Sequence, residues 1–229
     1  MEYLENTAIY SSQIHVDIQK QIIEAFEQNA DLSRKIAGKR KIEQGSIGKR
    51  TSLFPSVKNQ AMIPLESKLE LAYALSLEQN QNVEAYRTQA VKIPHAKNRF
   101  LFPDFLIKYK DGTYAIHEVK PSIQALSEKN LLKIRDIENI LKAMNIEFRV
   151  IDKNVLANDE LLQKILFFYS RGNAKLWPTE LLLSTQESLN KEYKTLNDLY
   201  NALTLHNISI HLGDYFIFHK IISIQGFSW

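Results

Sequence analysis

Apolar residues recur at every fourth position near the start of the chain, and this spacing is typical of an amphipathic helix. We expect a helix over residues 14–32. A second apolar stripe follows Pro64, and proline is favoured at an early helical position, so a second helix is expected to begin there. Glu66 and Glu70 lie one turn apart on this second helix, beside its apolar face. The stripe of the first helix comprises Ile14, Ile18, Ile22, Phe26 and Ala30.

The middle of the chain predicts three strands in succession, over residues 83–93, 99–108 and 113–120. A long helix is expected after Pro121, and Asn145 can end it in the left-handed conformation. Its apolar stripe comprises Leu131, Ile134, Ile137, Leu141 and Met144. A further strand is expected over residues 146–151. The order of helix, three strands, helix and strand predicts an α/β unit with a mixed sheet.

The turn between the second and third strands determines which side chains meet. Asp111-Gly112 is a strong hairpin signal. A two-residue loop would pair Asp104 with Val119 and place Asp104 on the opposite face from Glu118. A three-residue loop over residues 110–112, with Gly112 in the left-handed region, would instead pair Asp104 with Glu118. If Asp104 and Glu118 act together, the three-residue register or an equivalent bulge is required.

The last part of the chain predicts a separate module of three helices followed by a hairpin. Such an order is typical of a winged-helix domain. The first expected helix covers residues 161–169, the second begins at Pro178, and the third covers residues 196–205 with Thr195 as its cap. The expected hairpin pairs residues 208–212 with 215–218 across Gly213-Asp214. We therefore expect two domains, over residues 1–153 and 154–229. The second carries six basic and seven acidic residues, so protein docking is favoured over DNA binding, although both remain open.

Composition limits the possible chemistry of the 229-residue chain. Its 45% hydrophobic and 24% charged residues are enough for one large or two smaller cores. Without cysteine it can form neither disulfides nor thiolate metal sites, and its six histidines lack metal-ligand spacing. No apolar stretch approaches the roughly 18 residues of a membrane span, and the N-terminus does not read as a signal peptide. We expect a cytoplasmic protein without a membrane partner.

Positive charge is concentrated in a basic arm over residues 34–58, which carries eight basic residues and one acidic residue. The arm is either a solvated linker or a segment that follows a phosphate backbone. In the second case the expected DNA contacts are Lys39, Arg40, Lys41, Lys49 and Arg50.

Two acids and a lysine on neighbouring strands carry the candidate chemistry. Because side chains alternate along a strand, Glu118 and Lys120 point the same way. Carboxylates are the ligands that Mg²⁺ prefers, so Asp104 and Glu118 could hold this ion against a phosphodiester, with the Val119 carbonyl as a third ligand and Glu70 completing the cage. Lys120 would orient or help deprotonate the attacking water, a role that a lowered pKa would assist.

These residues form a pattern that resembles the TnsA transposon endonuclease family of the PD-(D/E)xK nuclease superfamily. The matching motifs are Ser67-Lys68-Leu69-Glu70, Gln89, Phe102-Pro103-Asp104-Phe105-Leu106, Asp111-Gly112 and Glu118-Val119-Lys120-Pro121. The resemblance implies a restriction-endonuclease-like mixed-sheet core followed by a winged-helix-like domain. It also implies a catalytic set of Glu70, Asp104, Glu118 and Lys120, with Gln89 contacting substrate or supporting the site. In the family a proline usually follows this glutamine, whereas Ala90 follows it here.

The resemblance further implies a Mg²⁺-dependent endonuclease, with Mn²⁺ as a substitute, that forms one half of a heteromeric transposase. It would cut the 5′ strands of double-stranded DNA at transposon ends, while a TnsB-type transposase cuts and joins the 3′ ends. A TnsC-type AAA+ regulator would dock on the C-terminal domain. The short chain is compatible with the CRISPR-associated subgroup, in which an RNA-guided complex chooses the target.

Two alternatives stay open at this point. A stand-alone restriction-type or repair nuclease would use the same core and cut DNA without a partner. A DNA-binding or scaffold protein would have a degenerate nuclease core, although all four expected catalytic positions are filled in this chain.

Overall fold

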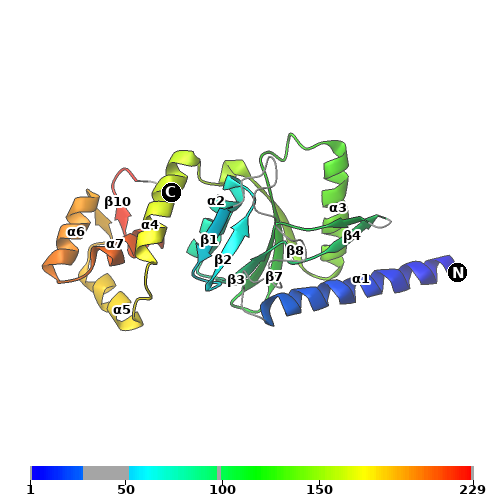
Figure 1. Ribbon diagram of the computed structural model, residues 1–229, viewed down its shortest axis with the longest axis horizontal. Coiled ribbons are helices and arrows are strands. Elements are labelled where there is room, and N and C mark those ends of the chain that lie inside the picture. The colour runs from blue at the N-terminus through cyan, green and yellow to red at the C-terminus, as the bar shows by residue number, and fades with distance from the viewer. Residues whose placement is uncertain (1, 28–51, 97–98, 228–229) are drawn as a thin grey trace. The chain divides into compact units, whose positions relative to one another are not determined.

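The computed structural model describes residues 2–27, 52–96 and 99–227, with side chains in the first helix from Gln13 onward. The chain divides into two compact units, residues 1–156 and 157–229 (Figure 1). No helix in the described part of the chain is long and apolar enough to cross a membrane.

A four-stranded mixed sheet forms the centre of the first unit (Figure 1). Its strands, in spatial order, are β3 (Val83–Thr88), β6 (Phe105–Tyr109), β7 (Tyr114–Lys120) and β8 (Glu147–Asp152). The first two pairings are antiparallel, and β7 pairs with β8 in parallel. The parallel step requires a crossover, which α3 (Glu128–Ala143) provides. The predicted mixed α/β unit is therefore confirmed.

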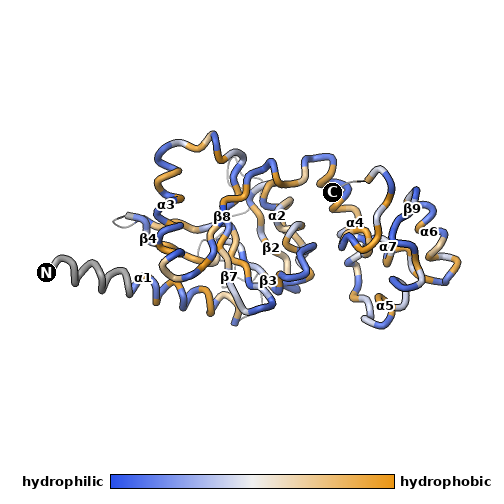
Figure 2. The backbone as a smooth tube through the Cα atoms, turned by 180° about the vertical axis from the view of Figure 1, so that it is seen from behind, coloured by the Kyte–Doolittle hydropathy of each residue, from blue (hydrophilic) through white to orange (hydrophobic). Residues whose placement is uncertain are grey.

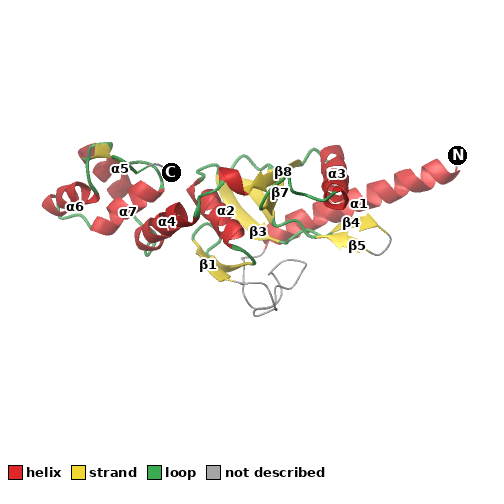
Figure 3. Cartoon of the chain, turned by 90° about the horizontal axis from the view of Figure 1, so that it is seen from above, coloured by secondary structure: helices red, strands yellow, loops and turns green. Residues whose placement is uncertain are grey.

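Helices cover both faces of this sheet (Figure 3). On one face, α1 (Glu2–Glu27) and α3 pack Ile18, Ile22 and Leu141 against Leu106 and Ile116. On the other face, α2 (Lys68–Gln79) places Tyr73 against the Phe105 ring, with centroids 5.0 Å apart. Because successive residues of a strand alternate faces, neighbouring positions on β6 and β7 serve the two layers in turn.

The prediction that a helix begins at Pro64 is wrong. Pro64 lies in β2 (Ala61–Leu65), which pairs antiparallel with β1 (Ser52–Ser56). The helix begins at Lys68, because Ser67 is its N-cap and accepts a hydrogen bond from the Glu70 N–H. Glu66 therefore precedes the helix, and the expectation that it lies on the helix beside Glu70 is wrong as well.

Two of the predicted strands were too long. The first ends at Thr88, because Gln89 adopts a left-handed φ of 48°. The second divides into β5 (Arg99–Leu101) and β6, and β5 pairs with β4 (Ile93–Ala96) in a separate hairpin.

The β6–β7 turn has the predicted three-residue loop. The Tyr109 N–H donates to the Thr113 carbonyl at 2.9 Å, and Gly112 has a φ of 85°. Phe105 pairs with His117, so the register brings Asp104 opposite Glu118. The expected end of α3 is also confirmed, since Asn145 has a φ of 57°.

The second unit consists of four helices and a short parallel bridge. The helices are α4 (Asp159–Gly172), α5 (Thr179–Ser188), α6 (Leu196–Leu205) and α7 (Ile210–Phe218); the bridge joins β9 (Glu192–Tyr193) to β10 (Ser223–Ile224). The three predicted helices are present, and Thr195 and Asp198 form a capping box at the start of α6. The predicted hairpin is wrong, because residues 210–218 form the single helix α7, hydrophobic along most of its length (Figure 2).

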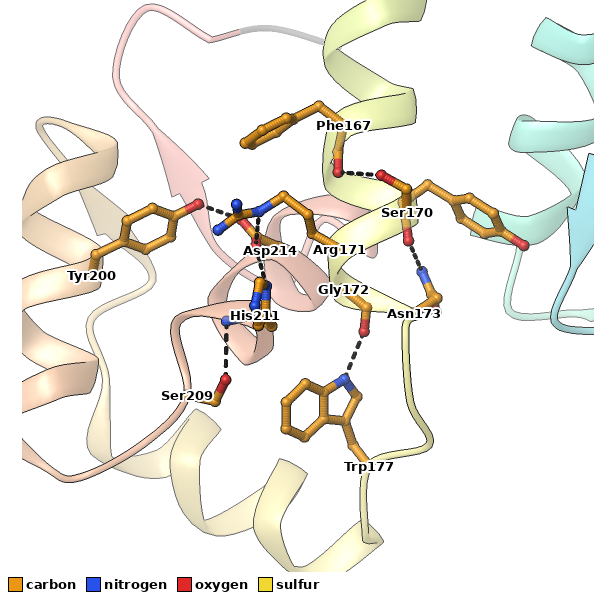
Figure 4. Close-up of polar contacts among 11 residues, drawn as sticks. Phe167, Ser170, Arg171, Gly172, Asn173, Trp177, Tyr200, Ser209, His211 and Asp214 are labelled. Atoms are coloured by element: carbon orange, nitrogen blue, oxygen red, sulfur yellow. Dashed lines mark hydrogen bonds and ion pairs between the residues drawn. The ribbon is translucent and has the colours of Figure 1, made fainter.

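Gly213-Asp214 is a packing site rather than a turn. A Cβ on Gly213 would lie 2.6 Å from a Leu203 methyl carbon, so glycine lets α7 approach α6 closely. Asp214 is fully buried and accepts hydrogen bonds from Arg171 Nε at 2.7 Å and from the Tyr200 hydroxyl, so it links α7 to α4 and α6 (Figure 4). A glycine–aspartate pair is common in turns, but here long-range contacts favour a helix. The winged-helix prediction is therefore not confirmed, because the segment expected to form the wing is a helix.

Candidate active site

Asp104 and Glu118 lie side by side where β6 begins and β7 approaches its end. The Asp104 N–H donates to Glu118 Oε2 at 3.2 Å, and the Val119 N–H donates to Asp104 Oδ2 at 2.8 Å. The three-residue turn sets this arrangement, because a register shift of one residue would turn Glu118 to the other face. The Val119 side chain is buried, so this residue faces Asp104 through its backbone.

Lys120 shares the face of Glu118, as the alternation of strand side chains predicts. Its ammonium group forms an ion pair with Glu118 Oε1. Both side chains stay partly accessible, at 29% for Lys120 and 16% for Glu118. A substrate phosphate could therefore reach both groups.

Glu70 lies in the first turn of α2 and is 8% exposed. Its Oε1 accepts from the Ser67 hydroxyl at 3.0 Å, and its Oε2 accepts from the Glu66 N–H at 2.8 Å. Its charge acts on both Asp104 and Lys120 and raises the pKa of each. Three carboxylates and one lysine are thus electrostatically linked.

Burial and like charge raise the pKa of Asp104 to about 7. Burial is the larger cause, and the neighbouring Glu118 carboxylate adds to it. The Val119 N–H and the Lys120 ammonium group partly offset the increase. The site is therefore short of positive charge, and a cation bound there would stabilise the ionised carboxylate.

The pKa of Lys120 is raised, so the lowered pKa that would have assisted Lys120 in deprotonating water is not found. Burial alone would lower it, but the attraction and hydrogen bond of Glu118, together with the charges of Asp104 and Glu70, outweigh burial. Lys120 is consequently an ammonium ion at neutral pH, suited to donating hydrogen bonds and balancing negative charge.

The donor set suits a hard divalent cation such as Mg²⁺. Within the described ranges, no three acid or histidine side chains already stand close enough together to hold a metal ion. Asp104 and Glu118 nevertheless offer adjacent oxygens, and ionised carboxylates keep further lone pairs when they accept one hydrogen bond. These two acids would form the core of a site, with Glu70 beside them. The Val119 carbonyl remains a predicted ligand.

Gln89 also lies at the site. Its N–H donates to the Asp104 carbonyl at 3.0 Å, and its Nε2 donates to Glu66 Oε2 at 3.4 Å. Its side chain is 3% exposed, and its left-handed backbone turns the chain away from the sheet beside Asp104. The glutamine therefore supports the Asp104 backbone and orients Glu66.

Tyr73 and His117 form a pair that sequence reasoning did not identify. The Tyr73 hydroxyl hydrogen-bonds His117 Nδ1 and ties α2, which carries Glu70, to β7, which carries Glu118. Burial lowers the pKa of His117 to about 4, so the ring is neutral. As expected from alternation, His117 faces away from Glu118. The signal in the sequence was the position of Tyr73, one helical turn after Glu70.

The five basic candidates Lys39, Arg40, Lys41, Lys49 and Arg50 lie outside the described residues. Only the end of the basic arm is described. There the Lys58 ammonium group donates to the Val83 carbonyl at 2.6 Å, beside the start of β3.

A protein-family comparison agrees with the geometry of the first unit. The family described as TnsA-like endonuclease N terminal matches residues 80–153, from the end of α2 to just past β8. The matched region contains Asp104, Glu118 and Lys120, whereas Glu70 precedes it. No curated protein matches the chain. Residues 80–153 of the chain are therefore similar to the N-terminal domain of TnsA-like endonucleases.

Proposed function

We propose that this protein is the Mg²⁺-dependent DNA endonuclease subunit of a heteromeric transposase, with Mn²⁺ as a substitute ion, in the bacterial cytoplasm. It would cut the 5′ strands at transposon ends for cut-and-paste transposition. The convergence of Asp104, Glu118 and Lys120 within a TnsA-like endonuclease domain is the observation that carries the proposal.

The residues divide the chemistry among them. Asp104 and Glu118 would hold Mg²⁺, which when bound polarises the phosphate and activates water. Glu70 would complete the negative site from α2. Because the pKa of Lys120 is raised, its role is to donate hydrogen bonds to water or phosphate and to balance developing charge, rather than to accept a proton.

The partners follow from the same family. Double-stranded transposon-end DNA is the proposed substrate, and a TnsB-type transposase is the proposed partner that processes the 3′ ends. A TnsC-type AAA+ regulator is proposed to dock on residues 157–229. The near balance of charge after Lys153 supports protein docking there over binding to phosphates.

Strand-specific cleavage tests the proposal. Transposon-end DNA labelled on the 5′ strand is incubated with Mg²⁺, the full chain and a TnsB-type transposase. We expect Asp104→Asn to lower the rate of 5′-strand cleavage by at least about a hundredfold, because the variant lacks the charge that holds the cation. Asp111→Asn is the matched control, since it lies on the same hairpin but is exposed.

Three outcomes distinguish the proposal from its alternatives. Undiminished cleavage by Asp104→Asn would remove this residue from the site and overturn the mechanism. Full-rate cleavage by the chain alone would favour a stand-alone restriction-type or repair nuclease. No cleavage by the native chain in any combination, with DNA still bound, would favour a non-catalytic DNA-binding or scaffold protein.

A further inference from the structure

A two-stranded ribbon is inserted into the chain between two residues of the candidate active site. Between Gln89 and Asp104 the backbone leaves the central sheet and forms the β4–β5 hairpin (Figures 1 and 3). The two ends of the insertion meet, because the Gln89 N–H donates to the Asp104 carbonyl at 3.0 Å. Asp104 follows Leu101 by three positions, which span at most about 10 Å. The ribbon is thus rooted at the site.

Side chains of two helices lie against the base of the ribbon. The Gln21 side chain on α1 donates to the Lys92 carbonyl at 3.2 Å and accepts from the Lys92 N–H at 2.9 Å. His95 Nδ1 lies 2.9 Å from Asp136 Oδ2 on α3. Ile93 is fully buried in the core beneath the ribbon. These contacts fix the direction in which the ribbon leaves the sheet.

The outer face of the ribbon combines an exposed aromatic ring with positive charge. Ile93 pairs with Leu101 on the inner face, so Pro94 and Phe100, the next pair, face outward. Phe100 is 44% exposed, and the Lys92 ammonium group lies 3.7 Å from its ring centroid. Arg99 is exposed beside it. Residues 90–103 contain three basic residues and no acidic residue.

We propose that the β4–β5 ribbon contacts DNA beside the scissile phosphate. Lys92 and Arg99 bind phosphates, and Phe100 packs against a base or sugar. The charge of the segment complements a phosphate backbone, and the major groove of B-DNA is wide enough for a two-stranded ribbon. A rigid ribbon rooted at Asp104 would fix the distance between the bound duplex and the acids. This inference rests on the proposed nuclease function.

Binding of a labelled duplex tests the ribbon without catalysis. The full chain is titrated into a fluorescein-labelled duplex of about 30 base pairs, roughly three helical turns, in EDTA at several salt concentrations. We expect the Lys92→Gln/Arg99→Gln variant to reduce the slope of log Kd against log salt by about 2, or about 1 for each lost phosphate contact. Phe100→Ala should weaken binding roughly tenfold.

Matched controls lie on the second unit. Phe167 is 45% exposed and has the Arg171 guanidinium 4.8 Å above its ring, so Phe167→Ala removes a similar aromatic–cation pair. Lys164→Gln/Lys175→Gln removes two exposed charges. We expect both controls to bind like the native chain. Equal behaviour of ribbon and control variants would overturn the proposal.

Different results would refute the proposed nuclease function and the proposed DNA contact of the ribbon. Normal cleavage by Asp104→Asn would refute the nuclease mechanism and leave the binding result in EDTA intact. Native DNA binding by both ribbon variants, with partner-stimulated cleavage reduced, would overturn the DNA proposal and assign the ribbon to a protein partner. Circular dichroism and melting of each variant establish that folding is unchanged, since all three side chains are accessible.

Discussion

Asp104 is expected to destabilise the metal-free protein above neutral pH. Its pKa is about 7 in the folded protein, against an ordinary value of 3.8 in an unfolded chain. Between these values the folded state binds more protons than the unfolded state, so stability contributed by this group falls as pH rises. Replacing the carboxyl group with the neutral amide of Asn removes this dependence and keeps an acceptor for the Val119 N–H.

The size of the effect follows from the shift of about 3 pH units. Each pH unit corresponds to about 1.4 kcal/mol, so Asp104→Asn should stabilise the first structural unit by at most about 4 kcal/mol at pH 8. Near pH 3 the gain should vanish, because the carboxyl group is protonated in both states. For a unit of this size each kcal/mol raises Tm by roughly 2–4 °C.

The assay is thermal and urea unfolding of the full chain in EDTA across this pH range. Asp152→Asn is a control that should lower, rather than raise, the unfolding free energy at pH 8. Hydrogen bonds from Asn154 and Ile123 lower the pKa of that exposed carboxylate, so its ionised form stabilises the folded state. Added Mg²⁺ should stabilise the native chain at pH 8 and have little effect on Asp104→Asn. A variant no more stable than the native chain at pH 8 in EDTA would refute the reasoning.

Two further predictions concern the pairing of α2 with β7 and the register of the hairpin. Burial lowers the pKa of His117 from 6.5 to about 4. Between these pH values the unfolded state binds more protons than the folded state, so the stability that this group contributes is lost as the pH falls toward 4. His117→Gln should flatten that loss in urea titrations at successive pH values, and an unchanged pH slope would contradict the assignment. Gly112→Ala should cost about 1 kcal/mol of unfolding free energy, because its φ is 85° while no atom lies within 4 Å of the new Cβ. Equilibrium unfolding measures this cost, and no loss of stability would show that the turn does not require the left-handed conformation.

Much of the candidate site could be predicted because it depends on short-range rules. Alternation along β7 puts Glu118 and Lys120 on one side, and Gly112 suits the left-handed position of a three-residue turn, the register required if Asp104 and Glu118 act together. The start of α2 is also encoded locally, in the Ser-x-x-Glu capping signature of Ser67 and Glu70. A proline is also common in a strand at a sheet edge, so Pro64 alone does not locate the start of the helix.

Other features depend on contacts between distant segments. The pattern between Gln89 and Asp104 predicted parts of two strands of the central sheet. In the structure this segment is a separate ribbon, contacted by Gln21 on α1 and by Asp136 on α3, which are both distant in the sequence. In the same way, the buried Asp214 is satisfied by Arg171 and Tyr200, which a local reading of Gly213-Asp214 as a turn could not include.

The sequence by itself indicated the mixed α/β unit and the shared face of Glu118 and Lys120, because these follow from periodicity and strand alternation over a few residues. It allowed either a two-residue or a three-residue β6–β7 turn, and the structure has the three-residue turn that brings Asp104 opposite Glu118. Only the tertiary structure decided the protonation of the site. Burial and the charges of Glu118 and Glu70 raise the pKa of Asp104. The carboxylates of Glu118, Asp104 and Glu70 raise the pKa of Lys120 against the opposing effect of burial, and both results depend on how α2, β6 and β7 pack. The lysine expected to help deprotonate water is for that reason a permanent cation at neutral pH.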